Sequence, residues 1–149
     1  MTARKLARTA AIVVDASVLL KTVIHEPESD DVTSALSHAA RANVSLLVVP
    51  LARYEVGNVL VKAARRAQAK VGGDEIEALV AHALTLVDER FARKAAQTAI
   101  EHSLSYYDAS YLALALGAKD TKLWTFDAKL GKAAEAENLR ITTQEILQY

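Results

Sequence analysis

Several features of well-known protein classes are missing from this chain. It contains no cysteine, which excludes disulfide frameworks and thiolate metal sites and is compatible with the cytoplasm, where we expect the protein to act. No apolar run approaches the roughly 18 residues of a membrane-spanning helix, so we expect no membrane partner. Eighteen basic residues balance eighteen acidic ones. Any binding of a polyanion must therefore come from a local patch rather than from the net charge.

The length and the apolar content indicate one packed domain. The chain has 149 residues, which is the size of a single domain, and 52% of them are hydrophobic, with alanine prominent among them. Alanine-rich composition favours helices that pack closely. We expect a basic extension over residues 1–11, which carries Arg4, Lys5 and Arg8, followed by a single domain over residues 12–149.

The stretch around Asp15 organises the predicted fold. Ile12, Val13 and Val14 form an apolar run typical of a strand that is buried on both faces of a parallel sheet. The other segments typical of strands are 44–49, 84–87, 122–125 and 139–142, and those typical of helices are 17–24, 28–41, 51–70, 74–81, 88–102, 106–116, 127–136 and a last turn at 143–147. Strands thus alternate with helices, which predicts an α/β fold with parallel strands and helices on both faces.

Four acidic residues occupy positions that the carboxyl edge of such a sheet would bring together. They are Asp15 after the first strand, Glu55 in the helix after the second, Asp108 at the start of the helix that leads to the fourth, and Asp127 just beyond the fourth. Ionised carboxylates at one place repel one another unless a cation neutralises them, and oxygen ligands suit Mg²⁺ or Mn²⁺. Such an ion can activate water and polarise a phosphodiester for hydrolysis.

Each of these acids also has a purely structural interpretation. Asp15 and Asp127 could cap the helices that follow them, and Asp108 lies three residues after Ser105, as in a capping box. Glu55 could be an ordinary solvated helix residue. Asp88 likewise follows a predicted strand, and we assign it no chemistry. Spacing alone therefore indicates an acidic metal site without establishing one.

The residues around these acids resemble the PIN-domain family and, within it, the VapC toxins of prokaryotic VapBC toxin–antitoxin pairs. The similar segments are 13–21, 50–60, 107–115 and 124–130, each of which carries one acid, in the order typical of the family. The resemblance covers nearly the whole chain from about residue 11. The basic extension departs from the usual start of the family, and no role is transferred to it.

This resemblance implies a fold, an activity and partners. The fold would be a three-layer α/β/α sandwich around a five-stranded parallel sheet of order 3-2-1-4-5, which leaves Asp88 at an edge. The activity would be Mg²⁺- or Mn²⁺-dependent cleavage of RNA, and the partners would be a VapB-type antitoxin and a second copy in a homodimer. The catalytic and metal-binding residues would be Asp15, Glu55, Asp108 and Asp127, supported by Ser17, Asn58 and Thr125.

Basic and aromatic side chains near the acids are candidates for contacts with RNA. Lys62, Arg65 and Arg66, with Lys70 beyond them, continue the polar face of the helix that carries Glu55, and Lys21 follows the first strand. The alternative is a solvated helix face.

The aromatic residues Tyr106, Tyr107, Tyr111 and Trp124 could stack on bases, although such residues more often belong to a core or an interface. The four histidines show no spacing typical of metal ligands, and we expect them at the surface or at helix ends.

Two other functions remain open from the sequence. The first is a non-catalytic PIN-like module that binds RNA or a protein. The second is a phosphatase or phosphoryl-transfer domain that uses Asp15. Such enzymes usually need a second aspartate two residues further on, where this chain has Ser17.

Overall fold

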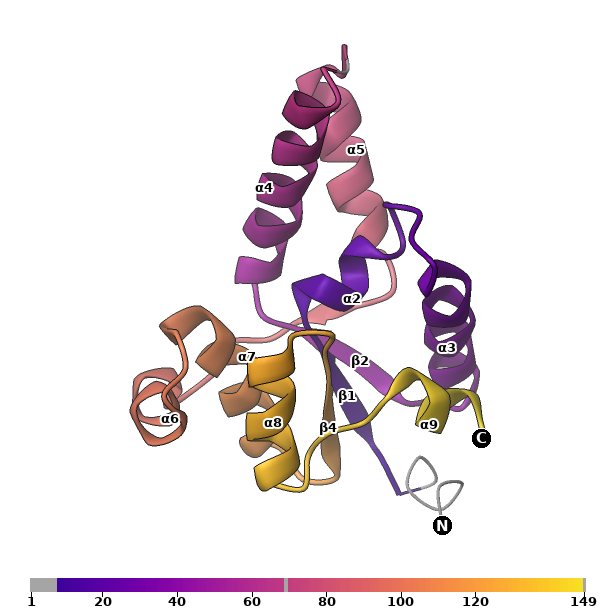
Figure 1. Ribbon diagram of the computed structural model, residues 1–149. Helices are drawn as coiled ribbons and strands as arrows, with labels where there is room; N and C mark the ends of the chain where they lie inside the picture. Colours follow the sequence, from indigo (N-terminus) through magenta and orange to yellow (C-terminus); the bar gives the residue numbers. More distant parts are fainter. Residues whose placement is uncertain (1–7, 69, 149) are drawn as a thin grey trace.

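A parallel sheet lies at the centre of the computed structural model (Figure 1). The structure describes residues 8–68 and 70–148, and within them the sheet has four strands in the order β3-β2-β1-β4. The strands are β1 (Ala11–Val14), β2 (Ser45–Val48), β3 (Asp88–Glu89) and β4 (Thr121–Trp124). The strand β1 pairs in parallel with both β2 and β4, so Asp15 emerges from the middle of the sheet.

Helices cover both faces of this sheet and extend beyond its end. They are α2 (Ala16–Leu20), α3 (Ser29–Arg41), α4 (Leu51–Arg66), α5 (Gly73–Ala83), α6 (Ala95–His102), α7 (Tyr106–Leu116), α8 (Ala128–Ala136) and α9 (Thr143–Leu147). Helices α3 and α9 pack together on one side, and α7 and α8 lie on the other (Figure 1). Helices α4 and α5 pack against each other as an arm that stands away from the sheet (Figure 1).

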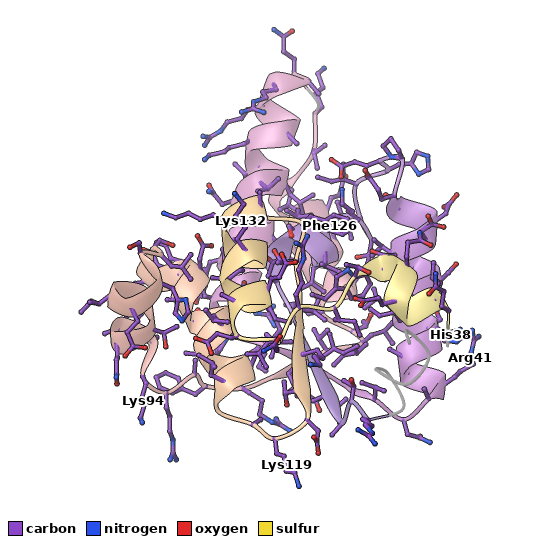
Figure 2. All side chains as sticks on the ribbon, turned by 60° about the horizontal axis from the view of Figure 1, so that its bottom comes forward. His38, Arg41, Lys94, Lys119, Phe126 and Lys132 are labelled. Atoms are coloured by element: carbon purple, nitrogen blue, oxygen red, sulfur yellow. The ribbon has the colours of Figure 1, made fainter. Side chains whose placement is uncertain are left out.

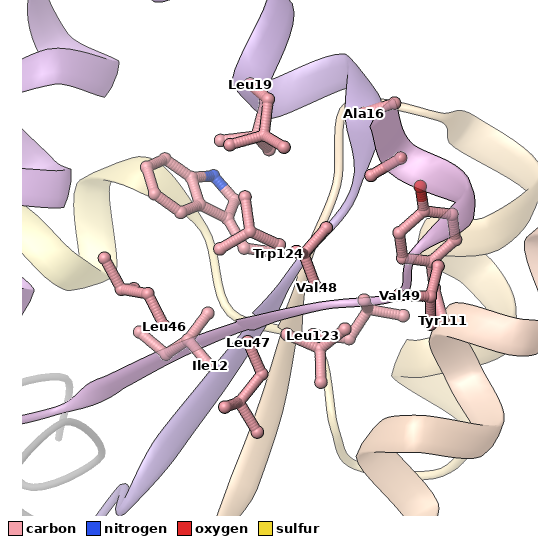
Figure 3. Packing of buried hydrophobic residues seen from close by; sticks show 14 of the residues in the cluster. Ile12, Ala16, Leu19, Leu46, Leu47, Val48, Val49, Tyr111, Leu123 and Trp124 are labelled. Atoms are coloured by element: carbon pink, nitrogen blue, oxygen red, sulfur yellow. The ribbon is translucent and has the colours of Figure 1, made fainter. Parts of the chain in front are cut away.

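The core forms where the strands are apolar on both faces. Ile12, Val13 and Val14 have no exposed surface. Side chains alternate along a strand, so the consecutive residues Leu123 and Trp124 of β4 point to opposite faces (Figure 3). Burying each large apolar side chain stabilises the fold by about 1.5–3 kcal/mol. The prediction of an α/β fold with a buried first strand is confirmed.

The predicted five-stranded sheet is wrong in two places. The fifth strand, expected at 139–142, is reduced to a single bridge between Leu123 and Arg140, because Thr142 already caps α9 and leaves no room for a longer pairing. The third strand lies at Asp88–Glu89 instead of 84–87, since Leu84 forms the end of α5. The order of the strands that do form agrees with 3-2-1-4, and Asp88 lies at the edge as expected.

Several predicted helix bounds also need correction. The predicted helix at 88–102 begins only at Ala95, because residues 88–89 pair with β2 and Lys94 adopts a left-handed backbone conformation. The helix after β1 ends at Leu20, and α4 ends at Arg66, two residues before Gln68 with its φ of 50°. Helices α3, α7 and α8 agree with their predictions to within one residue at each end.

The basic extension is described only in part. Arg4 and Lys5 lie outside the described residues, whereas Arg8 is exposed. In the part of the chain that the structure describes, no helix combines the length and the apolar character that crossing a membrane requires.

Candidate active site

The carboxylate of Asp15 is buried at the junction of β1 and α2. Only 5% of the residue is exposed. Its Oδ1 accepts hydrogen bonds from the backbone N–H groups of Ser17 (2.9 Å) and Val18 (3.4 Å), so Asp15 caps α2. The capping interpretation of Asp15 is therefore correct, and it does not exclude a second role, because the cap itself holds the carboxylate at the end of the central strand.

Two hydroxyl groups fix Asp15 from either side. Ser17 Oγ donates to Oδ1, and Thr125 Oγ1 donates to Oδ2 at 2.6 Å. Each hydroxyl also accepts a backbone hydrogen bond at 2.9 Å, Ser17 from Phe126 and Thr125 from Asp127. The loop between β4 and α8 is thus tied to Asp15 by both side chains. Their support of a metal site stays a prediction, but their contact with Asp15 is direct.

Burial makes the charge of Asp15 unfavourable. It raises the pKa of Asp15 above the ordinary value of 3.8, although the hydrogen bonds from Ser17, Thr125 and Val18 oppose that shift. A buried, hydrogen-bonded carboxyl group with a raised pKa at the end of a strand is a typical feature of functional sites.

Glu55 lies in the second turn of α4 and contacts a tyrosine that is distant in the sequence. Tyr111 of α7 donates its hydroxyl to Glu55 Oε1 at 2.7 Å. Burial raises the pKa of Glu55, and the negative charges of Asp15 and Asp108 raise it further. Burial and the carboxylate of Glu55 together raise the pKa of Tyr111, which therefore stays protonated as a donor. These interactions bring Asp15, Glu55 and Asp108 into one electrostatic group.

Asp108 and Asp127 lie at the starts of two helices beside this group. The backbone N–H of Asp108 donates to the cap residue Ser105 at 3.0 Å, which leaves the carboxylate of Asp108 in the first turn of α7. Asp127 caps α8 by accepting from the backbone of Leu130 at 2.7 Å. Its connection to Asp15 is indirect and passes through Thr125. Three of the predicted acids thus interact electrostatically, and the fourth is linked through a hydroxyl.

The chemistry of these acids fits a hard divalent cation, but their present positions do not form a closed site. Within the described residues, no three acidic or histidine side chains lie close enough together to hold a metal ion. The carboxylate oxygens are the ligands that Mg²⁺ and Mn²⁺ prefer, and the repulsion on Glu55 is of the kind that a cation relieves. An ion shared by these acids would need their carboxylates closer together than they lie in this structure.

The predicted RNA-binding residues fall into two groups. Lys62, Arg65 and Arg66 are exposed along the outer half of α4, on the arm, and Lys70 is exposed just beyond it. Lys21 differs, because its Nζ pairs with Glu26 and Glu28 and lies 4.6 Å from the ring centre of Phe126. Burial lowers the pKa of Lys21, but the two glutamates outweigh it and raise the pKa overall. The charge of Lys21 is therefore already balanced.

The aromatic residues divide between core and surface. Tyr111 and Trp124 are almost completely buried and cannot stack on a base, so that interpretation is wrong for them. Tyr106 and Tyr107 are exposed at the start of α7. Asn58, predicted to support the site, is exposed one turn beyond Glu55. The contact between Tyr111 and Glu55 was not predicted, since 56 residues separate them and no local pattern connects them.

The comparisons with known proteins identify the family. The PIN domain family model matches residues 12–136, so the chain belongs to the PIN domain family. PIN domains are a family of nucleases that generally depend on divalent metal ions, which supports a nuclease role for this chain.

The fold is also similar to a solved structure. The crystal structure of PAE2754 from Pyrobaculum aerophilum matches with a TM-score of 0.68 and 22% identity, and the match covers 93% of each chain. At this identity the likeness concerns the fold alone. A comparison with the curated proteins gives no significant match.

Proposed function

We propose that this protein is a Mg²⁺- or Mn²⁺-dependent endoribonuclease that acts as the toxin of a toxin–antitoxin pair. One observation supports the enzymatic part above all others. In a PIN domain, the buried and hydrogen-bonded Asp15 lies within electrostatic reach of Glu55, which in turn is influenced by Asp108. A glutamate whose pKa is raised by neighbouring acids, beside a buried aspartate at the carboxyl end of a central strand, is suited to a divalent ion and a phosphodiester.

The residues of the chain have distinct tasks in this proposal. Asp15, Glu55, Asp108 and Asp127 would hold the ion, which when bound polarises the phosphodiester and makes water more acidic. Ser17 and Thr125 fix the orientation of Asp15.

Tyr111 occupies Oε1 of Glu55, so Oε2 is the oxygen that can turn toward the ion or the attacking water. The raised pKa of Glu55 also makes it a better acceptor for the proton of that water.

Contacts outside the acid group would hold the RNA. Lys62, Arg65 and Arg66 are exposed on α4, the same helix that begins beside the site and carries Glu55, so a strand that passes along the arm reaches the acids. The pairing of Lys21 with two glutamates gives it a smaller part in binding phosphate, unless RNA displaces those partners.

The toxin role rests on the resemblance of four acid-bearing segments to VapC proteins. It implies a VapB-type antitoxin as inhibitor and a homodimer as the working form. A neighbouring short reading frame whose product copurifies with this protein and blocks its cleavage of RNA is the expected observation. An active nuclease that no product of the adjacent genes inhibits would contradict the toxin role and leave the nuclease role standing.

Paired substitutions test the enzymatic proposal. We expect Asp15→Asn and Asp108→Asn to lower the rate of RNA cleavage by about 10³-fold or more. Each variant should lose several kcal/mol of the stabilisation that a bound metal ion gives to the transition state. Asp88→Asn is the matched control, since Asp88 is an aspartate of the same sheet that lies exposed in the edge strand β3, away from the acid group. Cleavage should require Mg²⁺ or Mn²⁺ and stop with a chelator. Full activity of both site variants in chelator would overturn the proposal.

A non-catalytic PIN-like module is the second candidate. The observation in its favour is that, within the described residues, no three acids lie in position to hold an ion together. Titration with Mn²⁺ discriminates between the two functions. Saturable binding that Asp15→Asn abolishes supports the nuclease, whereas RNA binding with no Mn²⁺ binding and no cleavage supports the module.

A further inference from the structure

An apolar groove lies beside the acid group and is lined by exposed aromatic rings. Phe91, Tyr106 and Tyr107 are 83%, 59% and 60% exposed. They line a groove of about 190 Å³ whose remaining wall is formed by Val49, Pro50, Leu51, Ala92, Ala95 and Ser110. Exposed aromatic side chains that gather at one place on a soluble domain indicate a binding surface rather than a part of the core.

Two helices carry residues of both the groove and the acid group. On α4, Leu51 of the groove lies one turn before Glu55, on the same face of the helix. On α7, Tyr107 of the groove immediately precedes Asp108. A ligand bound at the acids can therefore extend into the groove without leaving the surface of the protein.

The loop that carries Phe91 is basic. Arg90, Arg93 and Lys94 surround it in the sequence and are exposed. Arg90 pairs with Asp88 at 3.7 Å, whereas Arg93 and Lys94 have no ion pair within the residues that the structure describes. Both line a neighbouring cavity of about 370 Å³, and Lys94 projects into solvent (Figure 2). An aromatic surface next to such cations is complementary to the bases and phosphates of a nucleic acid.

We propose that this groove receives one unpaired nucleobase of the RNA next to the bond that is cut, and that Arg93 and Lys94 contact the phosphates beyond it. The inference rests on the proposed ribonuclease function and adds the place on the surface where one base of the RNA is held. A base within a duplex is already stacked and paired, so only a single-stranded segment can supply one. The groove is smaller than the roughly 300 Å³ of pockets for larger ligands, which suits a single planar ring system.

Binding measurements test this assignment apart from cleavage. In full-length protein with Asp15→Asn, which prevents cleavage, we expect Phe91→Ala to weaken binding of a single-stranded RNA oligonucleotide by about 5- to 150-fold, the range for one stacked base. Phe91→Trp should preserve the affinity. Ile100→Ala is the matched control, since Ile100 is equally exposed on α6 but lies outside the groove, and it should leave the affinity unchanged.

Abasic oligonucleotides identify the nucleotide. Removal of one base from the RNA should weaken binding to the protein with intact Phe91, and the same RNA should then be insensitive to Phe91→Ala, because both changes remove one interaction. A duplex of the same sequence should not respond to Phe91→Ala. Equal effects of Phe91→Ala and Ile100→Ala, or an effect of Phe91→Ala on the oligomeric state without one on RNA, would overturn the inference.

The two proposals can fail separately. If the unmodified protein cleaves RNA and Phe91→Ala binds single strands normally, the groove assignment is wrong and the nuclease stands. If the protein neither binds nor cleaves RNA, the proposed function is wrong and the assignment fails with it.

Discussion

The two edges of the sheet are built in opposite ways. We call the β4 edge the buried side and the β3 edge the exposed side. Strand β4 pairs with β1 over four residues, and its apolar side chains are fully buried. Strand β3 consists of the exposed pair Asp88–Glu89 and is followed by the basic, aromatic loop of the groove. The buried side therefore holds the side chains of the candidate site in place, whereas the exposed side leaves its side chains accessible on the surface. In the two proposals above, the chemistry belongs to the first region and the recognition of RNA to the second.

Register explains why the buried side carries the site. Val14 is paired with Trp124, so the next residues, Asp15 and Thr125, emerge together at the end of the sheet. A slip of β4 by one residue would turn Thr125 to the other face and bury a different set of side chains, which the apolar residues of β4 strongly disfavour.

Leucine truncation on the two sides should give the largest contrast. We expect Leu123→Ala to lower the free energy of unfolding by about 2–5 kcal/mol, because Leu123 is completely buried in β4. Leu86→Ala, next to β3, should change it by no more than about 0.5 kcal/mol, since Leu86 is exposed. Urea unfolding followed by circular dichroism measures both. Equal losses would show that the two sides do not differ in packing.

A threonine pair tests the site on the buried side. We expect Thr125→Val to lower cleavage by about 10- to 100-fold, because Asp15 loses the donor that orients it. Thr85→Val is the matched control, since Thr85 bonds only to the carbonyl of His82 near β3 and should retain full activity. An active Thr125→Val enzyme would mean that the cap of α2 and the hydroxyl of Ser17 are sufficient to position Asp15.

A smaller effect concerns pH in metal-free protein. The folded state raises the pKa of Glu55 above its ordinary 4.5, so this group favours unfolding once the pH is high enough to ionise it. Below pH 4.5 the penalty is absent, it grows as the pH rises toward the raised pKa, and it is complete above that value. Glu55→Gln, which keeps an acceptor for Tyr111, should therefore be more stable than the unmodified protein near neutral pH and gain nothing in acid.

Thermal unfolding in chelator at several pH values checks this prediction. Glu89→Gln is the control on the β3 side, because its carboxylate is exposed and faces Arg53 at 3.5 Å. Added Mn²⁺ should stabilise the unmodified protein more than the Glu55→Gln variant. A variant that is less stable at neutral pH than the unmodified protein would show that the hydrogen bond from Tyr111 outweighs the repulsion.

Local signals in the sequence were sufficient for much of the buried side. The apolar run before Asp15 predicts β1, and the cap residues Ser105 and Asp127 predict the starts of α7 and α8. These signals work because burial and capping depend on residues close together in the chain. The location of Asp15, at the end of the central strand, follows from them.

The exposed side could not be predicted, because its structure depends on contacts between residues that are far apart in the chain. Asp88 and Glu89 have the character of a turn or helix start, and only their pairing with Leu47 and Val48 makes them a strand. Once they pair, the chain cannot continue as a helix, and the loop with Phe91 results. The raised pKa of Glu55 comes from its burial and from the acids Asp15 and Asp108, against the hydrogen bond from Tyr111, and only the folded chain brings these groups together.

The central place of β1 has a consequence for synthesis. The hydroxyl of Thr125 that orients Asp15 is made 110 residues after Asp15, once the chain has passed through β2 and β3. A nascent chain therefore cannot form the contact that orients Asp15 until β4 and the residue after it have been made. The proposed site is thus assembled only after the helices and strands between Asp15 and Thr125 have been made.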